Sequence, residues 1–184
     1  MSVDQGQILL PLARAAITRE LGIAAATPAA AAAWLQQPGS AFVTLTRDGR
    51  LRGRNGSLIP VRPLREDVAA NAVAAAFRDP RFPPLTAAEL ETTLIEVSVL
   101  SALESLAAGS EAAVLRQLRP GVDGLVFRYG HHRSTFLPDT WSQYADPGEF
   151  LAQLKYKAGL PPDFWDTGVE LRRYTVDCWR EPGI

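Results

Sequence analysis

Apolar side chains recur every three or four residues in three long segments, a spacing that places them on one face of a helix. Glycine or proline follows each of these segments, and both residues stop helices. We therefore predict helices over Asp4–Leu21, Leu64–Arg78 and Pro147–Ala158. Two shorter helices are expected in the alanine-rich segment Ala24–Gln37 and in Ser110–Leu118.

The last long helix has the clearest boundaries. Asp146 is an N-cap residue, Pro147 suits the first helical position, and Glu149 completes the spacing of a capping box. Gly159 follows the helix, where a glycine takes the left-handed conformation without strain. The boundaries of this helix are therefore predicted from four residues.

Strands are indicated by alternation and by β-branched residues. Ala41–Thr46 reads as a strand, Asp48-Gly49 as a tight hairpin turn, and the chain from Leu51 onward as the partner strand. Further strands are expected over Thr93–Leu100, Gly124–Tyr129, Thr135–Leu137 and Val169–Trp179, with Gly130 joining the second and third of these into a hairpin. No linker composition interrupts the chain. We expect one domain over 1–184, in the form of one unit or of two closely packed subdomains.

Composition narrows the class of protein. The chain has 184 residues, of which 47% are apolar and 21% charged, and its apolar runs are too short to cross a bilayer. Its single cysteine, Cys178, excludes an internal disulfide framework. The first residues lack the basic and apolar regions of a signal peptide. We expect a cytoplasmic protein without membrane contact.

Charge is distributed unevenly along the chain. The segment 47–65 has six arginines and one acidic residue, a net charge of +5, whereas the remainder carries −6. An acidic protein with one basic stretch is not expected to bind DNA, but it can hold a particular anion. The glycines of this stretch match neither a Walker loop nor a dinucleotide fingerprint. No cofactor is expected.

A set of short motifs follows in a fixed order along the chain. The first part of the set is Phe42-Val43-Thr44-Leu45, Leu51-Arg52-Gly53, Gly56-Ser57-Leu58, Asp67-Val68 and Asn71-Ala72. The second part is Asp79-Pro80-Arg81-Phe82, Glu96-Val97-Ser98-Val99-Leu100, Pro120-Gly121-Val122-Asp123-Gly124, Thr135-Phe136-Leu137-Pro138 and Lys157-Ala158-Gly159-Leu160. The set covers almost the whole chain and resembles the AMMECR-one family, whose bacterial and archaeal members are called AmmeMemoRadiSam system protein A.

The resemblance implies an α+β fold built on an antiparallel, barrel-like sheet with helices packed outside. It also implies a setting with Memo-like and radical SAM proteins as partners, and we expect a bacterial source. The family has no firmly assigned reaction.

One motif departs from the family pattern. The family reads Leu-Arg-Gly-Cys-Ile-Gly where this chain reads Leu51-Arg52-Gly53-Arg54-Asn55-Gly56. A family mechanism that needs the cysteine as a nucleophile or a metal ligand therefore cannot operate here.

The same segment is the first candidate site. Strand spacing would place Arg50, Arg52 and Arg54 on one face, where three guanidinium groups repel unless an anion lies among them. Gly53 and Gly56 would open the backbone to a ligand, as in anion nests. We expect Arg52, Gly53, Arg54, Asn55 and Gly56 to bind a small anion, although a solvated edge strand with a tight turn is an alternative. If Arg52 is a structural strut instead, Glu96 is the first candidate for its partner.

The remaining candidates are weaker. Glu96 and Ser98 share a strand face and could act as a base and a positioning hydroxyl in a cleft. His131 and His132 face opposite sides of an extended segment, so no metal site is expected there. Cys178 alternates with Val176, which suggests a buried structural thiol.

Two functions follow from these features. One is a protein that binds a small anion or another small ligand. Such a protein could be an enzyme, with Glu96 as a catalytic residue. The alternative is a non-catalytic adaptor module that docks a partner protein through the loop Arg52–Gly56.

Overall fold

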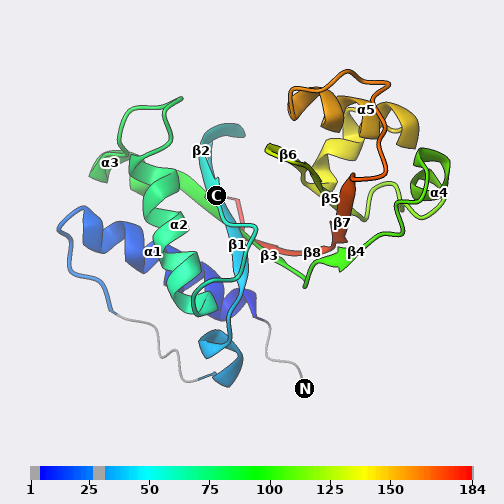
Figure 1. Cartoon of the computed structure of the whole chain (residues 1–184). Coiled ribbons are helices and arrows are strands. Elements are labelled where there is room, and N and C mark those ends of the chain that lie inside the picture. Colours follow the sequence, from blue (N-terminus) through cyan, green and yellow to red (C-terminus); the bar gives the residue numbers. More distant parts are fainter. Residues whose placement is uncertain (1–4, 27–31, 184) are drawn as a thin grey trace. The chain divides into compact units, whose positions relative to one another are not determined.

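The chain folds into two compact units. The computed structural model describes residues 5–26 and 32–183. Unit 1 comprises Met1–Leu100 and Asp177–Ile184, and unit 2 comprises Ser101–Val176 (Figure 1). Each unit has its own cluster of buried apolar side chains, so each has its own core.

Unit 1 is built on a four-stranded sheet in the order β2-β1-β3-β8. Its central strand β1 pairs antiparallel with both β2 and β3. The strands are β1 (Ser40–Arg47), β2 (Arg50–Gly56), β3 (Thr93–Leu100) and β8 (Val176–Arg180). The expected hairpin at Asp48-Gly49 is confirmed, and both turn residues have positive φ angles of 51° and 72°.

Helices cover one face of this sheet. Helix α2 (Leu64–Phe77) packs on β1 and β2, and α1 (Gly6–Glu20) packs on α2 and β3 (Figure 1). The odd-numbered strand residues Val43, Leu45, Ile95 and Val97 face these helices and are fully buried. The 3-10 helix η1 (Ala33–Gln36) and the short helix α3 (Ala87–Leu90) complete the unit. The even-numbered residues of β1 and β3 occupy the opposite face, which carries part of the candidate site.

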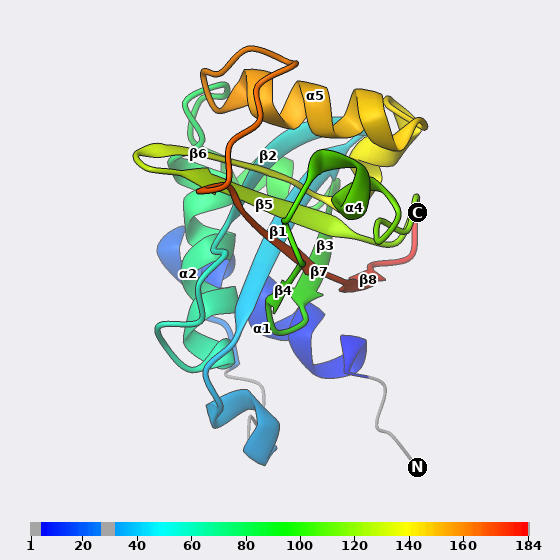
Figure 2. The ribbon, with the colours of Figure 1, turned by 45° about the vertical axis from the view of Figure 1, so that its right-hand side comes forward.

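Unit 2 has a second four-stranded sheet, in the order β4-β7-β5-β6. Helix α5 packs against β6 (Figure 2). Its core includes the ring of Trp141, which stacks on that of Phe150 with centroids 3.8 Å apart. The elements are β4 (Glu104–Ser105), α4 (Glu111–Leu115), β5 (Gly124–Tyr129), β6 (His132–Phe136), η2 (Pro138–Ser142), α5 (Pro147–Lys157) and β7 (Glu170–Tyr174).

The helix with the clearest sequence signals begins and ends as expected. The backbone N–H of Glu149 donates to Asp146 Oδ1 at 2.9 Å, and Pro147 opens the helix. Gly159 has a φ angle of +83°, as a left-handed residue after the helix requires.

The expected barrel-like sheet is not found. Within the described ranges, the strands form two open sheets that each keep to their own four strands, and neither sheet closes on itself. The α+β class with antiparallel pairing is confirmed. None of the described helices is long and apolar enough to cross a membrane.

Several boundaries differ from the expectations, among them that of β6, which spans His132–Phe136 instead of Thr135–Leu137. The strand expected over Val169–Trp179 is two strands in different sheets, because the chain leaves one ladder at Thr175. There the Thr175 backbone instead bonds Ser101, whose N–H donates to Thr175 O at 2.9 Å. The helix expected over Ser110–Leu118 is only α4. Of the helix expected over Ala24–Gln37, residues 27–31 lie outside the described residues and the rest contributes only η1.

Candidate functional site

A β-bulge interrupts the basic strand β2. Leu45 pairs with Gly53 and Thr46 pairs with Leu51, so Arg52 is an extra residue between two consecutive pairs. An extra residue shifts the alternation of side chains by one position. The bulge therefore decides which way each arginine of this strand points.

The three arginines do not form the single row that strict alternation predicts. Arg50 is exposed at the end of the hairpin, and Arg52 is buried with 8% of its surface exposed. Arg54 pairs with Thr44 and shares its face of the sheet, opposite the helices. The expectation of one shared face was wrong because the bulge at Arg52 breaks the period of two.

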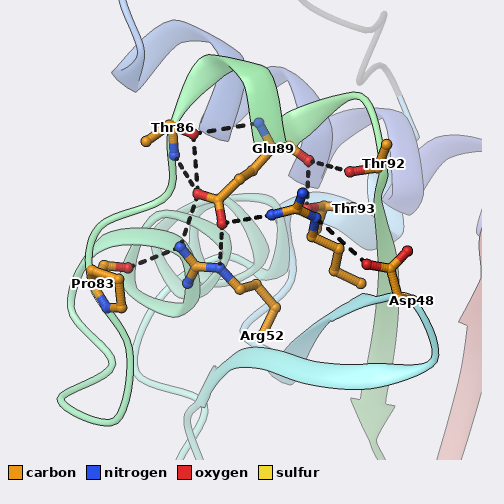
Figure 3. Close-up of polar contacts among 8 residues, drawn as sticks. Asp48, Arg52, Pro83, Thr86, Glu89, Thr92 and Thr93 are labelled. Atoms are coloured by element: carbon orange, nitrogen blue, oxygen red, sulfur yellow. Dashed lines mark hydrogen bonds and ion pairs between the residues drawn. The ribbon is translucent and has the colours of Figure 1, made fainter.

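Arg52 is held by a carboxylate from α3 (Figure 3). Its Nε and Nη2 donate to the two oxygens of Glu89 at 3.1 Å each, and Nη2 also donates to Pro83 O at 3.0 Å. Arg47 Nη1 donates to Glu89 Oε1 at 3.0 Å. Two arginines thus converge on one carboxylate, and the partner of Arg52 is Glu89 rather than Glu96.

Thr86 positions this carboxylate. Thr86 caps α3, and its own backbone N–H donates to Glu89 Oε2 at 3.0 Å (Figure 3). The Arg52 guanidinium, followed by the Thr86 backbone, lowers the pKa of Glu89 from 4.5 to about 2. The spacing Thr86-x-x-Glu89 is a capping-box signal that could have revealed α3 from the sequence.

The motif glycines make room for the protein itself. A Cβ on Gly53 would lie 2.1 Å from the carbonyl oxygen of Ala75 in α2, and one on Gly56 would lie 2.2 Å from the Phe42 ring. The Asn55 side chain accepts the Gly56 N–H at 2.7 Å. Gly53, Asn55 and Gly56 therefore shape the strand and its contact with α2.

A row of polar side chains crosses the other face of the sheet. Thr44 pairs with Arg54 on one side and with Glu96 on the other, so the three residues share a face across three adjacent strands. Arg54 lies over the Phe42 ring, 5.8 Å from its centroid. Arg180 Nε lies 3.7 Å from Glu96 Oε2. This row unites two of the candidates from the sequence, Arg54 and Glu96.

Two further polar groups belong to this face. Ser98 pairs with Phe42 one step along the strands, and Cys178 of β8 interacts with Ser98 and Glu96. Partial burial of the Cys178 thiol, more than the nearby Glu96 charge, raises its pKa. The prediction of a buried thiol was wrong, because Cys178 is exposed on β8.

Asp79 fixes the backbone beside Arg54. Its Oδ2 accepts the Arg54 N–H at 2.9 Å, and both of its oxygens accept from the Arg81 guanidinium at 2.9 and 2.6 Å. These hydrogen bonds, with that of the Arg81 side chain the largest, hold the pKa of Asp79 well below its usual range. The motif Asp79-Pro80-Arg81 thus anchors the strand at the point where Arg54 emerges.

The two histidines lie in unit 2. His132 Nδ1 lies 2.9 Å from Ala158 O, and the rings of His131 and His132 are 4.2 Å apart. In the part of the chain that the structure describes, no three His, Cys, Asp or Glu side chains gather as metal ligands would.

Comparisons with known proteins agree with the motif resemblance. The family model AMMECR1 matches residues 10–179. A protein of Methanothermobacter thermautotrophicus is 37% identical in an alignment of 187 residues. The alignment covers 100% of this chain and 97% of the relative. A protein of Thermococcus onnurineus is 38% identical, with 97% and 91% covered. These relatives are archaeal and give no support to the expected bacterial source.

The fold also has a counterpart among solved structures. The crystal structure of Uncharacterized Protein PH0010 from Pyrococcus horikoshii superposes with a TM-score of 0.86 at 34% sequence identity. The match covers 98% of this chain and 93% of that protein.

Proposed function

The chain belongs to the AMMECR1 family, and we propose that it binds a small anionic ligand on the helix-free face of the sheet in unit 1. Arg54 holds the anionic group of the ligand, and Glu96 receives a hydroxyl or amino group at its other end. The proposal keeps the expected class of ligand but moves the site away from Arg52, whose guanidinium holds Glu89.

The observation that carries this proposal is the row Arg54, Thr44 and Glu96. Adjacent strands lie ~4.8 Å apart, so the backbones of Arg54 and Glu96 are separated by roughly 10 Å. Thr44 lies between them, and its buried hydroxyl has no hydrogen-bond partner among the described residues. A buried hydroxyl without a hydrogen bond is energetically unfavourable, and a hydrogen bond to a ligand or to water removes this cost. The row therefore suits a ligand with polar groups at both ends and in the middle.

The arginine at position 54 also limits the chemistry. A guanidinium stays protonated and donates hydrogen bonds in a planar fork, which suits carboxylates and phosphates. It cannot act as a nucleophile, so Arg54 binds and orients the ligand, and the Glu96 carboxylate is a group on this face that could move a proton.

A thermal-shift screen with citrate, glutamate and related carboxylates tests the proposal, because a ligand of the folded state raises the melting temperature. For a compound that does so, Arg54→Ala should weaken binding at least tenfold, since one charge-assisted contact is worth about 1.5–3 kcal/mol. Arg65→Ala removes an exposed arginine from α2 and serves as the matched control. Undiminished affinity in Arg54→Ala would exclude the sheet face as the site.

A second candidate function is the adaptor role. Burial of Arg52 makes the loop Arg52–Gly56 a poor docking surface, but the adjoining loop exposes Ile59 by 64% and Val61 by 77%. Asp67, which is 1% exposed, holds this loop by accepting from Arg62 Nε at 2.9 Å. An apolar tip on a fixed loop favours docking of a partner protein.

The family resemblance suggests Memo-like and radical SAM proteins as partners, and we propose this loop as the surface that docks one of them. Copurification of each with the wild-type chain and with an Ile59→Ser, Val61→Ser double variant tests the adaptor role. Capture by the wild type and loss in the variant is the expected result. Equal capture by both chains would remove the loop from the interface.

A further inference from the structure

A second basic region lies at the end of the β1–β2 hairpin. A groove of about 330 Å³ is lined there by Arg47, Asp48, Arg50, Leu51 and Arg52. None of these residues belongs to the row of Arg54, Thr44 and Glu96. The groove is therefore a separate candidate site.

Donors of two arginines in this groove are unused. The Arg52 side chain is 10% exposed, and its buried Nη1 finds no hydrogen-bond partner in the described ranges 5–26 and 32–183. Figure 3 shows this nitrogen without a dashed line, while Nε and Nη2 both bond Glu89. Arg47 Nε is also buried without a hydrogen bond in that part of the chain, and only an ion pair of 3.9 Å joins it to Asp48.

Unused guanidinium donors in a buried position are unfavourable, because they have lost water without gaining an acceptor. The balance of charges around the groove also favours binding of an anion. Three arginines line or flank the groove against the carboxylates of Glu89 and Asp48, which leaves one positive charge unbalanced. Asp48 is a weak counter-ion because its side chain is 85% exposed. An anion with several acceptor oxygens would satisfy both the donors and the charge.

We propose that this groove binds a phosphoryl group, held by the guanidinium groups of Arg47, Arg50 and Arg52. Glu89 fixes the directions of Arg47 and Arg52 before the ligand arrives, and exposed Arg50 closes on the ligand from the end of the hairpin. A phosphoryl group offers three acceptor oxygens and free phosphate offers four, whereas a carboxylate offers two. The groove volume lies at the lower end of the range for small-molecule sites, which leaves room for a phosphorylated small molecule as well as free phosphate.

Calorimetric titration with inorganic phosphate and, separately, with a phosphorylated sugar tests the site in 0.15 M NaCl. Arg50→Ala is the informative variant, because Arg50 is exposed and lies outside the contacts that Arg47 and Arg52 make with Glu89. We expect it to weaken binding of at least one of the two probes about tenfold. Arg54→Ala and Arg65→Ala should bind like the wild type, since the first lies on the sheet face and the second on α2.

Each outcome decides the proposal. Tighter binding of the sugar phosphate than of phosphate, with both sensitive to Arg50→Ala, identifies a phosphorylated metabolite as the ligand class. The reverse order identifies the free ion. Loss of binding in Arg54→Ala but not in Arg50→Ala would place the anion on the sheet face, which overturns this inference and supports the proposed function. Equal losses of affinity in Arg50→Ala and Arg65→Ala would reject the groove as a site. The groove would also be rejected if the wild type binds neither probe at a concentration of ~10 mM, about 20-fold above that of the protein.

Discussion

Each unit contains one buried cation among the residues that the structure describes, and the two are held differently. In unit 1, Arg52 bonds both oxygens of Glu89 and shares that carboxylate with Arg47. In unit 2, Lys155 is fully buried, and its Nζ donates to Glu111 Oε1 at 3.0 Å and to Phe164 O at 3.1 Å.

The two cations differ in whether a nitrogen atom remains without a hydrogen-bond acceptor. Lys155 is enclosed, and its ammonium group bonds acceptors of its own unit. Arg52 borders a groove and keeps one nitrogen without an acceptor in the described chain. A lysine is a point charge that two or three acceptors satisfy, whereas a guanidinium has five donors in a fixed plane. The arginine cluster, formed by Arg47, Arg52 and Glu89, can therefore combine a structural role with binding, and the lysine contact is structural alone.

The largest effect is expected for Glu111→Ala. Removal of this carboxylate leaves the buried Lys155 ammonium without its counter-ion, which typically costs about 3–5 kcal/mol. Urea denaturation followed by circular dichroism measures the loss. A Lys155→Met, Glu111→Ala double variant removes both charges and should recover much of the stability. Failure to recover would show that the shape of the lysine, rather than its charge, maintains the contact.

Calorimetry of the same variant also tests whether the units unfold together. The absence of a linker composition predicts one cooperative transition for the whole chain, shifted to lower temperature in Glu111→Ala. Two separable transitions, with only one of them shifted, would contradict this prediction and assign independent stability to unit 1.

Acid should weaken the arginine cluster. The pKa of Glu89 is about 2 in the folded chain against an ordinary value of 4.5, so the unfolded chain binds the proton first as pH falls. The stability from Glu89 is complete above about pH 5 and is lost as pH falls towards 2, by at most about 3 kcal/mol. Urea denaturation at pH 6, 4 and 3 should give a flatter pH dependence for Glu89→Gln than for the wild type. Parallel curves would mean that the Arg52 contact contributes nothing in this range.

Arg52→Lys separates charge from geometry. Lysine keeps the positive charge but loses the paired bonds from Nε and Nη2 to Glu89, so we expect a loss of about 1.5–3 kcal/mol. Arg50→Lys, at the exposed end of the same hairpin, should change stability by less than ~0.5 kcal/mol. Wild-type stability of Arg52→Lys would reduce the cluster to simple charge attraction and bring it closer to the Lys155 contact.

The smallest effect is expected at the cap of the helix that carries Lys155. Asp146→Ala removes the acceptor for the Glu149 N–H and should cost about 1 kcal/mol. Asp146→Asn keeps an acceptor oxygen and should retain most of the stability. A loss in Asp146→Ala as large as that in Glu111→Ala would mean that α5 is held by its first turn rather than by its buried lysine.

The regular elements were predictable because their signals are local. Helix α5 follows from Asp146, whose side chain caps the first turn, and from Pro147 and Gly159, whose backbone angles suit its two ends. Strand β3 follows from its alternation, with Ile95 and Val97 buried and Glu96 on the other face. These signals need no knowledge of the partner strands, so they can be read one segment at a time.

The candidate site was only partly predictable because it depends on pairing. The bulge at Arg52 arises from the register of β2 against β1, and strict alternation assigns Arg52 to the wrong face. Its partner Glu89 lies 37 residues away in a short helix that the sequence analysis missed. Arg54 and Glu96 were both named as candidates, but only the pairing of Thr44 with each of them places them on one face.

The bulge has a consequence for how the chain behaves at high concentration. Strand β2 is the outermost strand at one end of its sheet, and an outer strand with a regular ladder can pair with the same strand of another molecule. An extra residue at Arg52 breaks the spacing of the backbone hydrogen-bonding groups, and the neighbouring arginines repel a second copy of the strand. The feature that turns Arg52 towards Glu89 thus also protects the protein against edge-to-edge aggregation.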